Sequence, residues 1–445
     1  MTTAQLGAAY PFASARPLPA DRVLVGRDLA GGPFVHDPFS LYAASVLTNP
    51  NMTVVGQIGR GKSALVKSYL FRQAAFGRQV AVLDPKGEYG ALAAALGTEP
   101  ICLCPGGAVQ MNPLDAAITG GVPEATTVAG RAALDTGGDT RHRRLGLLRA
   151  LVEATLRRHM KPCEHLALEV ALDSASAAAS RLGQRAPTLN LVVDLLLGPE
   201  EAAARASGMR RVTLEDDGRD VGLELRRLVR GELAGMFDGD TNEALSPRPG
   251  GATVKGPGPS TGASPGPLIV DLSAVYHSEA LPALMVCAAS WLQAMTSIEG
   301  SFTLFVVDEA WSILSDASVG RYLRSSWKLS RAKGLANIAV CHRISDLSSA
   351  GSAGSEQSRL AEGLLADSET VVCYAQPPSE LPALSAALGC SMEELSVLPR
   401  LPRGIALWRV AGRSFLVEHL LGDDERQMVD TDHRLRPRDD GPALE

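Results

Sequence analysis

The amino-acid sequence predicts an α/β protein with a mostly parallel central sheet flanked by helices and an inserted all-α subdomain. Strand-like and helix-like segments alternate over residues 21–118 and again over 267–422, and the stretch between them lacks strand patterns. A glycine-rich turn also joins a strand to a helix near residue 60. Such alternation indicates parallel strands joined by crossover helices. With 445 residues the chain exceeds a typical single core, so we expect more than one domain or subdomain.

The first alternating half follows an Ala- and Pro-rich arm, residues 1–20, which we expect to be flexible. Short apolar runs bounded by turn residues predict strands, and longer segments with apolar residues three and four positions apart predict helices. Strands are expected at 52–57, 79–84 and 100–104, and helices at 62–76 and 88–96.

Residues 119–238 form the predicted helical insertion, because strand patterns disappear there and apolar residues recur at helical spacing. Its helices are expected at 141–160, 164–181, 188–197 and 219–236. Residues 239–266 are rich in Gly, Pro and Ser, a composition that predicts a disordered loop.

The second alternating half resumes the strand pattern at residue 267 and ends in a hairpin-like segment. Beyond it, the charged residues 423–445 predict a flexible C-terminal tail. The strands of this half are expected at 267–272, 302–310, 336–342 and 369–374, the helices at 278–296 and 318–333, and the hairpin at 404–420.

Composition and charge exclude some classes of protein. The formal net charge of −6 argues against a wholly basic nucleic-acid coat, and 4% aromatic residues argue against aromatic base-stacking platforms. Seven dispersed cysteines indicate reduced thiols in a cytoplasmic protein. The longest apolar run, residues 281–295, contains Pro, Ser and Gln and is shorter than a membrane span, so it predicts a buried helix and at most peripheral membrane contact.

Arginine-rich segments in the helical insertion have two interpretations. They could face the phosphates of DNA, or they could be the solvated faces of amphipathic helices. Of 43 basic residues 36 are arginine, which suggests a general compositional bias and favours the second interpretation. The arginines concerned are Arg141, Arg143, Arg144, Arg149, Arg157, Arg158, Arg226, Arg227 and Arg230.

The glycine-rich turn reads GQIGRGKS and matches the phosphate-binding pattern G-x-x-x-x-G-K-[ST], with a strand before it and a helix after it. The glycines let backbone N–H groups turn inward around an anion, and the helix N-terminus adds its dipole. We expect ATP to bind here, with Lys62 reaching the β- and γ-phosphates and Ser63 ligating Mg²⁺. The expected binding residues of the turn are Gly56, Gln57, Ile58, Gly59, Arg60, Gly61, Lys62, Ser63 and Ala64.

Two predicted strands end in an aspartate that could hold the magnesium ion. Only Asp308 is followed by a glutamate, so Asp308 is the better magnesium partner and Glu309 the better base to polarise the attacking water. Asp271 more simply caps the turn after its strand.

The segment LDPKGEYGAL, residues 83–92, begins at the end of another predicted strand. In a parallel sheet the carboxyl ends of strands line the ligand crevice, so Asp84, Lys86 and Glu88 could lie near the phosphates or a neighbouring subunit. A tight polar turn between strand and helix is the alternative, and the spacing alone does not decide between them.

His342 also ends a predicted strand, where it could contact the γ-phosphate or orient water, the alternative being a polar strand end without a role. An arginine finger acting across a subunit interface would require a ring. Arg331 is our choice among the candidates Arg321, Arg324, Arg331 and Arg343.

Taken in order, these motifs resemble a known family. GQIGRGKS, LDPKGEYGAL, MNPLD and VVDEAW are similar to the motor domain of type IV secretion and conjugation ATPases of the VirB/TraC kind, in the HerA/FtsK division of RecA-like P-loop ATPases. The resemblance runs from GGPFVHDPF, residues 31–39, to LPRGIALWRVAGRSFLVE, residues 401–418, and covers roughly residues 25–420.

The resemblance implies a RecA-like P-loop ATPase that forms a homo-hexameric ring on a membrane-embedded secretion or conjugation channel. ATP hydrolysis would drive apparatus assembly or the transfer of DNA or DNA–protein substrates, with the protein cytoplasmic or peripheral on the cytoplasmic face of the membrane. It also implies that Asp84 and Glu88 neighbour the active site. Members carry a large N-terminal domain, whereas about 25 residues precede the resemblance here, and many have glutamine where this chain has His342.

Two other functions remain open at this stage. A HerA/FtsK-like translocase would act on duplex DNA without a membrane partner. An ATP-gated assembly component would bind ATP to set the state of the ring and barely hydrolyse it, although the intact Asp308–Glu309 pair argues against this.

Overall fold

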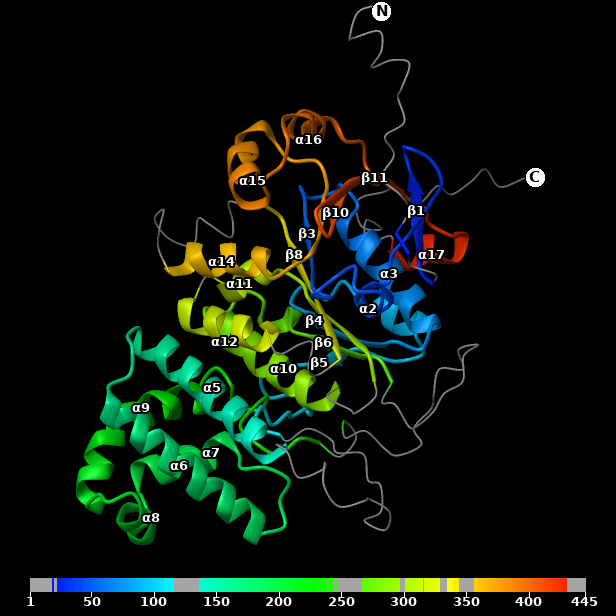
Figure 1. The fold of residues 1–445 in the computed structure, drawn as a ribbon. Helices are drawn as coiled ribbons and strands as arrows, with labels where there is room; N and C mark the ends of the chain where they lie inside the picture. The colour runs from blue at the N-terminus through cyan, green and yellow to red at the C-terminus, as the bar shows by residue number, and fades with distance from the viewer. Residues whose placement is uncertain are drawn as a thin grey trace, which may run out of the picture.

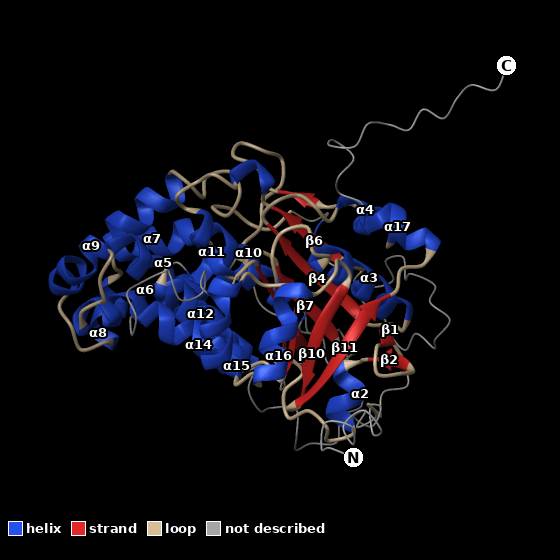
Figure 2. Cartoon of the chain, turned by 90° about the horizontal axis from the view of Figure 1, so that it is seen from above, coloured by secondary structure: helices blue, strands red, loops and turns tan. Residues whose placement is uncertain are grey.

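The computed structural model describes residues 18–19, 22–115, 136–242, 245, 266–296, 301–314, 316–328, 334–343 and 356–429. Within these residues a central sheet carries helices on both faces, and a separate group of helices extends from one side (Figures 1 and 2). The predicted α/β class with a mostly parallel sheet and an all-helical segment is therefore confirmed.

Seven adjacent strands form the parallel part of the sheet, counted over the described residues. Their buried runs of Val, Ile, Leu and Ala suit a sheet that is covered on both faces. Because parallel strands end at one edge, the residues that follow them are brought together there. In spatial order the strands are β9 (Thr370–Cys373), β3 (Met52–Val55), β8 (Leu335–Cys341), β7 (Thr303–Val307), β4 (Gln79–Asp84), β6 (Leu268–Asp271) and β5 (Ile101–Cys102).

Four antiparallel strands continue the sheet beyond β9. The predicted hairpin is present as β10 (Ile405–Val410) and β11 (Arg413–His419), and it is followed by β1 (Leu24–Asp28) and β2 (Pro33–Val35), two short strands that the sequence analysis missed. A Cβ at Gly26 would lie 2.0 Å from the carbonyl oxygen of Glu418, so glycine allows β1 to pack this closely on β11. Such pairing depends on distant chain segments rather than on local pattern.

Alternate residues of the strands point into two hydrophobic cores, one on each face of the sheet. One face is covered by α2 (Pro38–Ala43), α3 (Lys62–Ala75), α4 (Gly90–Ala95) and α17 (Asp423–Val429). The other is covered by α10 (Leu281–Thr296), α11 (Ala310–Leu314), α12 (Ala317–Lys328) and α14 (Glu356–Ala366), with α15 (Leu381–Leu388) and α16 (Met392–Val397) beyond them (Figure 1).

The apolar run at 281–295 lies in α10, which is buried on nearly all sides. Buried helices of this kind are apolar around their whole circumference. Among the helices that the structure describes, none has both the length and the apolar character needed to cross a membrane.

The helical insertion lies apart from the sheet, at the lower left of Figure 1. Its last helix begins at Arg211, earlier than predicted, and Gly218 and Gly222 lie on its face toward α7. A Cβ at Gly222 would lie 2.7 Å from the Cδ2 atom of Leu197, which shows how closely the two helices approach. The helices are α5 (Thr136–Leu156), α6 (Pro162–Arg181), α7 (Leu189–Leu197), α8 (Glu201–Ala206) and α9 (Arg211–Arg230).

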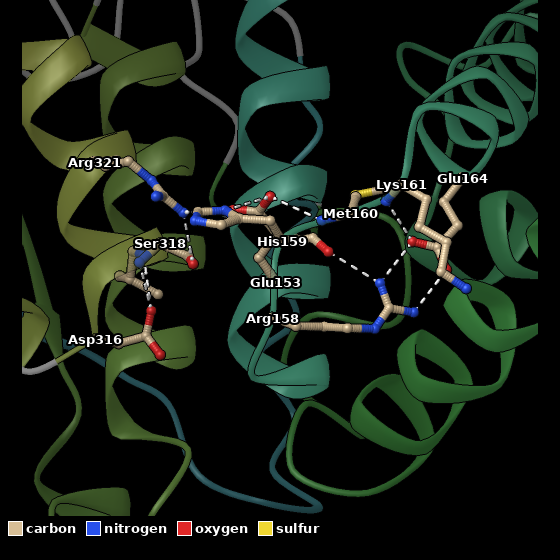
Figure 3. A network of polar contacts seen from close by, with 10 residues as sticks. Glu153, Arg158, His159, Met160, Lys161, Glu164, Asp316, Ser318 and Arg321 are labelled. Atoms are coloured by element: carbon tan, nitrogen blue, oxygen red, sulfur yellow. Dashed lines mark hydrogen bonds and ion pairs between the residues drawn. The ribbon is translucent and has the colours of Figure 1, made fainter. Parts of the chain in front are cut away.

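Polar contacts join the insertion to the core of the protein (Figure 3). Arg321 of α12 donates to the carboxylate of Glu153 in α5 at 2.6 Å, and next to it the guanidinium of Arg158 binds both oxygens of Glu164 at 2.8 and 2.6 Å. Paired guanidinium and carboxylate groups of this kind hold two elements in a defined orientation. Glu153, Arg158 and Arg321 also line a polar cavity of about 640 Å³.

Most of the nine arginines that could face DNA bind acidic side chains or backbone carbonyls of this protein. These contacts favour the structural interpretation for the arginines concerned over a row of groups presented to DNA. The pairs are Arg141 with Asp173, Arg149 with Glu169, Arg158 with Glu164, and Arg227 with Glu224 and Glu232, while Arg143 binds Ser290 and Arg144 binds the carbonyl of Leu114.

The C-terminal segment differs from its prediction as a flexible tail starting at residue 423. Residues 423–429 form the helix α17, which packs beside α3 and α4. Arg72 of α3 holds it in place with two hydrogen bonds of 2.6 Å to the carboxylate of Glu425. The prediction failed because this helix is highly charged and its stability depends on a partner far away in the sequence. Residues 430–445 lie outside the described part of the chain.

We expect the buried histidine His36 to make the fold sensitive to acid. Burial lowers its pKa to about 4, although the charge of Asp37 opposes the shift, and its ring bonds Tyr69 Oη at 2.9 Å and Thr370 Oγ1 at 3.2 Å. Because the unfolded chain takes up this proton first, the stabilisation is complete above pH 6.5 and is lost as the pH falls toward 4. The free energy of unfolding should drop by about 2 kcal/mol between pH 7.5 and pH 5 from this group.

Urea unfolding at both pH values measures this effect, and His36→Gln should reduce the pH-dependent part while the exposed His277→Gln should not. Some pH dependence should remain, since burial and the charge of Arg72 lower the pKa of His419 to about 4 as well. An unchanged pH dependence in folded His36→Gln would rule out His36 as its source.

Candidate active site

The glycine-rich turn connects β3 to α3 and wraps around the start of that helix. Gly59 and Gly61 have φ angles of 77° and 111°, a left-handed region that favours glycine. Gly56 is required for a different reason, because a Cβ there would lie 2.4 Å from the Cβ of Tyr374. The tip of the turn is open, with Ile58 78% exposed. The backbone can therefore curve around an anion at the N-terminus of α3, as the motif predicts.

Lys62 is the first residue of α3, and its side chain is buried against the turn. Its Nζ atom donates hydrogen bonds to the carbonyl oxygens of Gly56 and Gln57, the second at 3.0 Å. Burial lowers the pKa of Lys62 to about 8, and the negative charges of Asp308 and Glu309 oppose this shift. The structure thus brings the predicted phosphate-binding lysine and the predicted carboxylate pair to one place.

The predicted magnesium ligand Asp308 follows β7. This strand pairs with β8, which pairs in turn with β3, so the carboxylate pair stands at the same sheet edge as the glycine-rich turn. Asp308 is buried, and its Oδ1 atom accepts a hydrogen bond of 2.9 Å from the backbone N–H of Glu309. Burial, together with the adjacent charge of Glu309, raises the pKa of Asp308 to about 6.

Glu309 is held by three side chains. His342 Nε2 lies 2.8 Å from its Oε1 atom, Lys86 Nζ forms an ion pair with the same oxygen, and the indole N–H of Trp311 donates to Oε2. Burial would raise the pKa of Glu309, but the hydrogen bonds from His342 and Lys86 outweigh it and lower the pKa to about 2. Two adjacent carboxylates thus acquire different proton affinities from their surroundings.

The backbone of Glu309 adds to this arrangement, since its φ angle is 51°. A non-glycine residue in the left-handed region costs about 1 kcal/mol or more and persists where the surrounding structure holds it. The conformation turns the chain from β7 into α11 and directs the glutamate side chain toward the end of β8.

Asp84 and Glu88 lie at the neighbouring strand end, in the turn that leads from β4 to α4. The buried carboxylate of Asp84 accepts backbone hydrogen bonds from Lys86 at 3.2 Å, Gly87 at 2.9 Å and Tyr89 at 2.9 Å. Asp84 therefore shapes the turn that carries Lys86, and burial raises its pKa. Glu88 is half-buried in the same turn.

The other candidates from the sequence are Asp271 and the arginines considered for an arginine finger. Asp271 accepts the backbone N–H of Ser273 at 2.7 Å, which agrees with the predicted cap on the turn after its strand. Arg321 and Arg324 pair with carboxylates of α5 and of the residue after α14. Arg331, our choice for an arginine finger, lies outside the described residues.

Two contacts of this site were not predicted. Lys86 was expected near the phosphates or a neighbouring subunit and not at Glu309, and no role was expected for Trp311. The contact of Lys86 with Glu309 depends on how the strands are ordered in the sheet, whereas Trp311 lies two residues after Glu309 in the chain. Tyr374, which packs on the turn at Gly56, has no local sequence signal.

Comparisons with known proteins concern the fold of the chain as a whole. No protein-family model and no curated protein matches the chain. Among solved structures, VirB4 of Thermoanaerobacter pseudethanolicus has a TM-score of 0.66 at 20% sequence identity, covering 93% of this chain and 100% of its own. This chain has the RecA-like fold of VirB4. The fold predicted from the ordered motifs is confirmed.

A second solved structure agrees with the VirB4 comparison. The plasmid coupling protein TrwB, in complex with ADP and Mg²⁺, has a TM-score of 0.53 at 15% sequence identity, covering 95% of this chain and 93% of its own. TrwB with the non-hydrolysable ATP analogue ADPNP gives the same TM-score at 14% identity. The similarity to VirB4 and TrwB thus holds at the level of the fold and spans nearly the whole chain.

The residues of this site are suited to a magnesium nucleotide. The backbone of the turn curves inward, and the buried ammonium of Lys62 lies beside the start of a helix. Both are features of a phosphate-binding site. Asp308 and the half-buried Ser63 offer oxygen ligands, which Mg²⁺ prefers while it keeps several waters.

Proposed function

We propose that this protein is an ATP-hydrolysing motor of a type IV secretion or conjugation system. Hydrolysis would power the transfer of DNA or protein, or the assembly of the transfer apparatus. One observation carries the proposal: on the fold of VirB4 and TrwB, the Asp308–Glu309 pair stands at the same sheet edge as Lys62 of the phosphate-binding turn.

Each residue has a role in the proposed reaction. Bound MgATP supplies the reactive phosphoryl group and the charge that neutralises it. The backbone of 56–61 and Lys62 would hold the phosphates, while Ser63 and, through water, Asp308 would hold the metal. Glu309 would polarise the attacking water, and His342 keeps its carboxylate oriented. Asp84 positions the turn after β4, with Glu88 beside it.

We further propose the assembly in which this chemistry occurs. The motor domain comprises 21–118 and 267–422, and 119–238 is a helical insertion. Six copies would form a ring in which Arg331 of one copy completes the site of the next. The ring would dock from the cytoplasm on a membrane-embedded channel, in keeping with the fold of VirB4 and of the plasmid coupling protein TrwB.

Steady-state hydrolysis of ATP by the purified chain tests the proposal. Glu309→Gln should lower turnover at least about 100-fold, because it removes the general base, and should leave ATP binding intact. The matched control is Glu393→Gln, an exposed glutamate of α16, which should behave as the wild type.

The same assay with single- and double-stranded DNA separates the candidate functions. Stimulation by single-stranded DNA favours conjugation, whereas stimulation by duplex DNA without any membrane partner favours a duplex translocase. Equally negligible turnover in the wild type and Glu309→Gln would contradict a motor and leave an ATP-gated assembly component.

A further inference from the structure

The carboxylate of Glu309 is held by three donors in the structure, two of them on the same oxygen. Two donors, Lys86 Nζ and His342 Nε2, converge on Oε1, and Trp311 Nε1 bonds Oε2. The two nitrogens on Oε1 are 3.3 Å apart, as expected of two donors that share one acceptor. A general base must offer an oxygen to the water whose proton it accepts. Loss of one partner from Oε1 would free this oxygen to accept a hydrogen bond from water.

Lys86 is the partner best able to leave. His342 follows β8 and Trp311 belongs to α11, so both are carried by elements packed in the core. Lys86 lies in the turn after β4, its side chain is 28% exposed, and its charge sits on a flexible stem. It is also the member of the group with a permanent positive charge, which gives it a strong alternative partner in any phosphate nearby.

The position of Lys86 agrees with such an exchange. Its turn lies at the sheet edge shared by β4, β7 and β3, where the phosphate-binding turn begins. Lys86 forms an ion pair with Glu309, and the charges of Asp308 and Glu309 act on the buried ammonium of Lys62, so both lysines lie near the same carboxylate pair. An anion at Lys62 would therefore attract Lys86 as well.

We propose that Lys86 is a positioning residue that alternates between two partners, Glu309 and the terminal phosphate of ATP. Bound to Glu309, it occupies Oε1, so that water cannot bond this oxygen. Bound to the γ-phosphate, it releases Oε1 while His342 and Trp311 keep the carboxylate oriented. The final step rests on the proposed ATP hydrolysis, but the exchange of partners requires ATP binding alone.

Nucleotide affinity provides the first test, with titration calorimetry of the full chain using Mg²⁺ with either ADPNP or ADP. Lys86→Met should weaken ADPNP about tenfold, the size of one charge-assisted contact, and leave ADP within about twofold, because ADP lacks the γ-phosphate. Lys86→Arg should restore most of the ADPNP affinity. Lys328→Met, at an exposed lysine of α12, should change neither.

Tryptophan fluorescence provides a second readout that does not depend on turnover. Trp311 is half-buried and bonded to Glu309, whereas Trp291, Trp327 and Trp408 are buried. ADPNP should change the emission of Trp311 in a way that ADP does not. The difference should disappear in Trp311→Phe and in Lys86→Met.

The outcomes separate this inference from the proposed function. Equal weakening of ADPNP and ADP in Lys86→Met, or an unchanged ADPNP affinity, would overturn the exchange even if the protein hydrolyses ATP. A selective loss of ADPNP affinity together with the Trp311 signal supports it, even if turnover proves negligible and the motor is rejected.

Discussion

Replacing Lys62 by alanine is expected to lower the affinity for MgATP at least about 100-fold, equivalent to about 3 kcal/mol. The ammonium group is buried beside the turn, donates to two carbonyl oxygens of it, and interacts electrostatically with Asp308 and Glu309. Phosphates at the start of α3 would meet this charge in a region screened from water, where a charge-assisted hydrogen bond is strong. Titration calorimetry with ADPNP measures the change directly.

The matched control is Lys328→Ala, which removes an exposed lysine and should leave ADPNP affinity unchanged. Circular dichroism must show that both variants remain folded, because Lys62 also bonds the backbone of its own turn. If folded Lys62→Ala retains the ADPNP affinity of the wild type, the turn at 56–63 is not the phosphate site.

The largest effect on stability is expected at Arg72. Its guanidinium binds Glu425 with two hydrogen bonds of 2.6 Å and also donates to the carbonyl oxygens of Leu24, Val25 and Leu420. The side chains of Arg72 and Glu425 are only 19% and 8% exposed. Arg72→Met keeps the apolar stem but leaves these acceptors without their donor, so urea unfolding should show a loss of about 3 kcal/mol.

An exposed ion pair between β1 and β11 serves as the comparison. Arg27 binds Glu418 at 2.6 Å, but the two side chains are 62% and 35% exposed. Arg27→Met should therefore cost less than about 1 kcal/mol. A double-mutant cycle of Arg72→Met with Glu425→Gln isolates the contribution of the buried pair. Equal losses in Arg72→Met and Arg27→Met would refute the idea that Arg72 fastens α17.

Local sequence patterns were enough to predict the phosphate-binding turn and the elements around it. The requirement for glycine at 59 and 61 and the lysine at the start of α3 all arise within a single strand–turn–helix unit. The apolar run of β7 followed by Asp308 and Glu309 is similarly local. Alternating strand and helix patterns also sufficed for the parallel sheet, because crossover connections leave few other arrangements.

Contacts between distant segments could not be predicted from local sequence patterns. Neither the pairing of β1 with β11 nor the packing of α17 on α3 has a local signal, and the Arg72–Glu425 contact joins residues 353 positions apart. Which strands are neighbours is decided by how all the apolar faces are buried together, and short polar segments such as α17 acquire their structure only from that packing.

The sequence by itself determined that this chain has a P-loop, a carboxylate pair and an α/β fold with a mostly parallel sheet, because each follows from local patterns, and the resemblance of its ordered motifs implied the RecA-like class. Only the tertiary structure decided what surrounds the base. The order β4-β7-β8-β3 brings Lys86, Glu309 and His342 from three different strand ends to one point. Their contact is a consequence of strand order, which no single segment of the chain encodes.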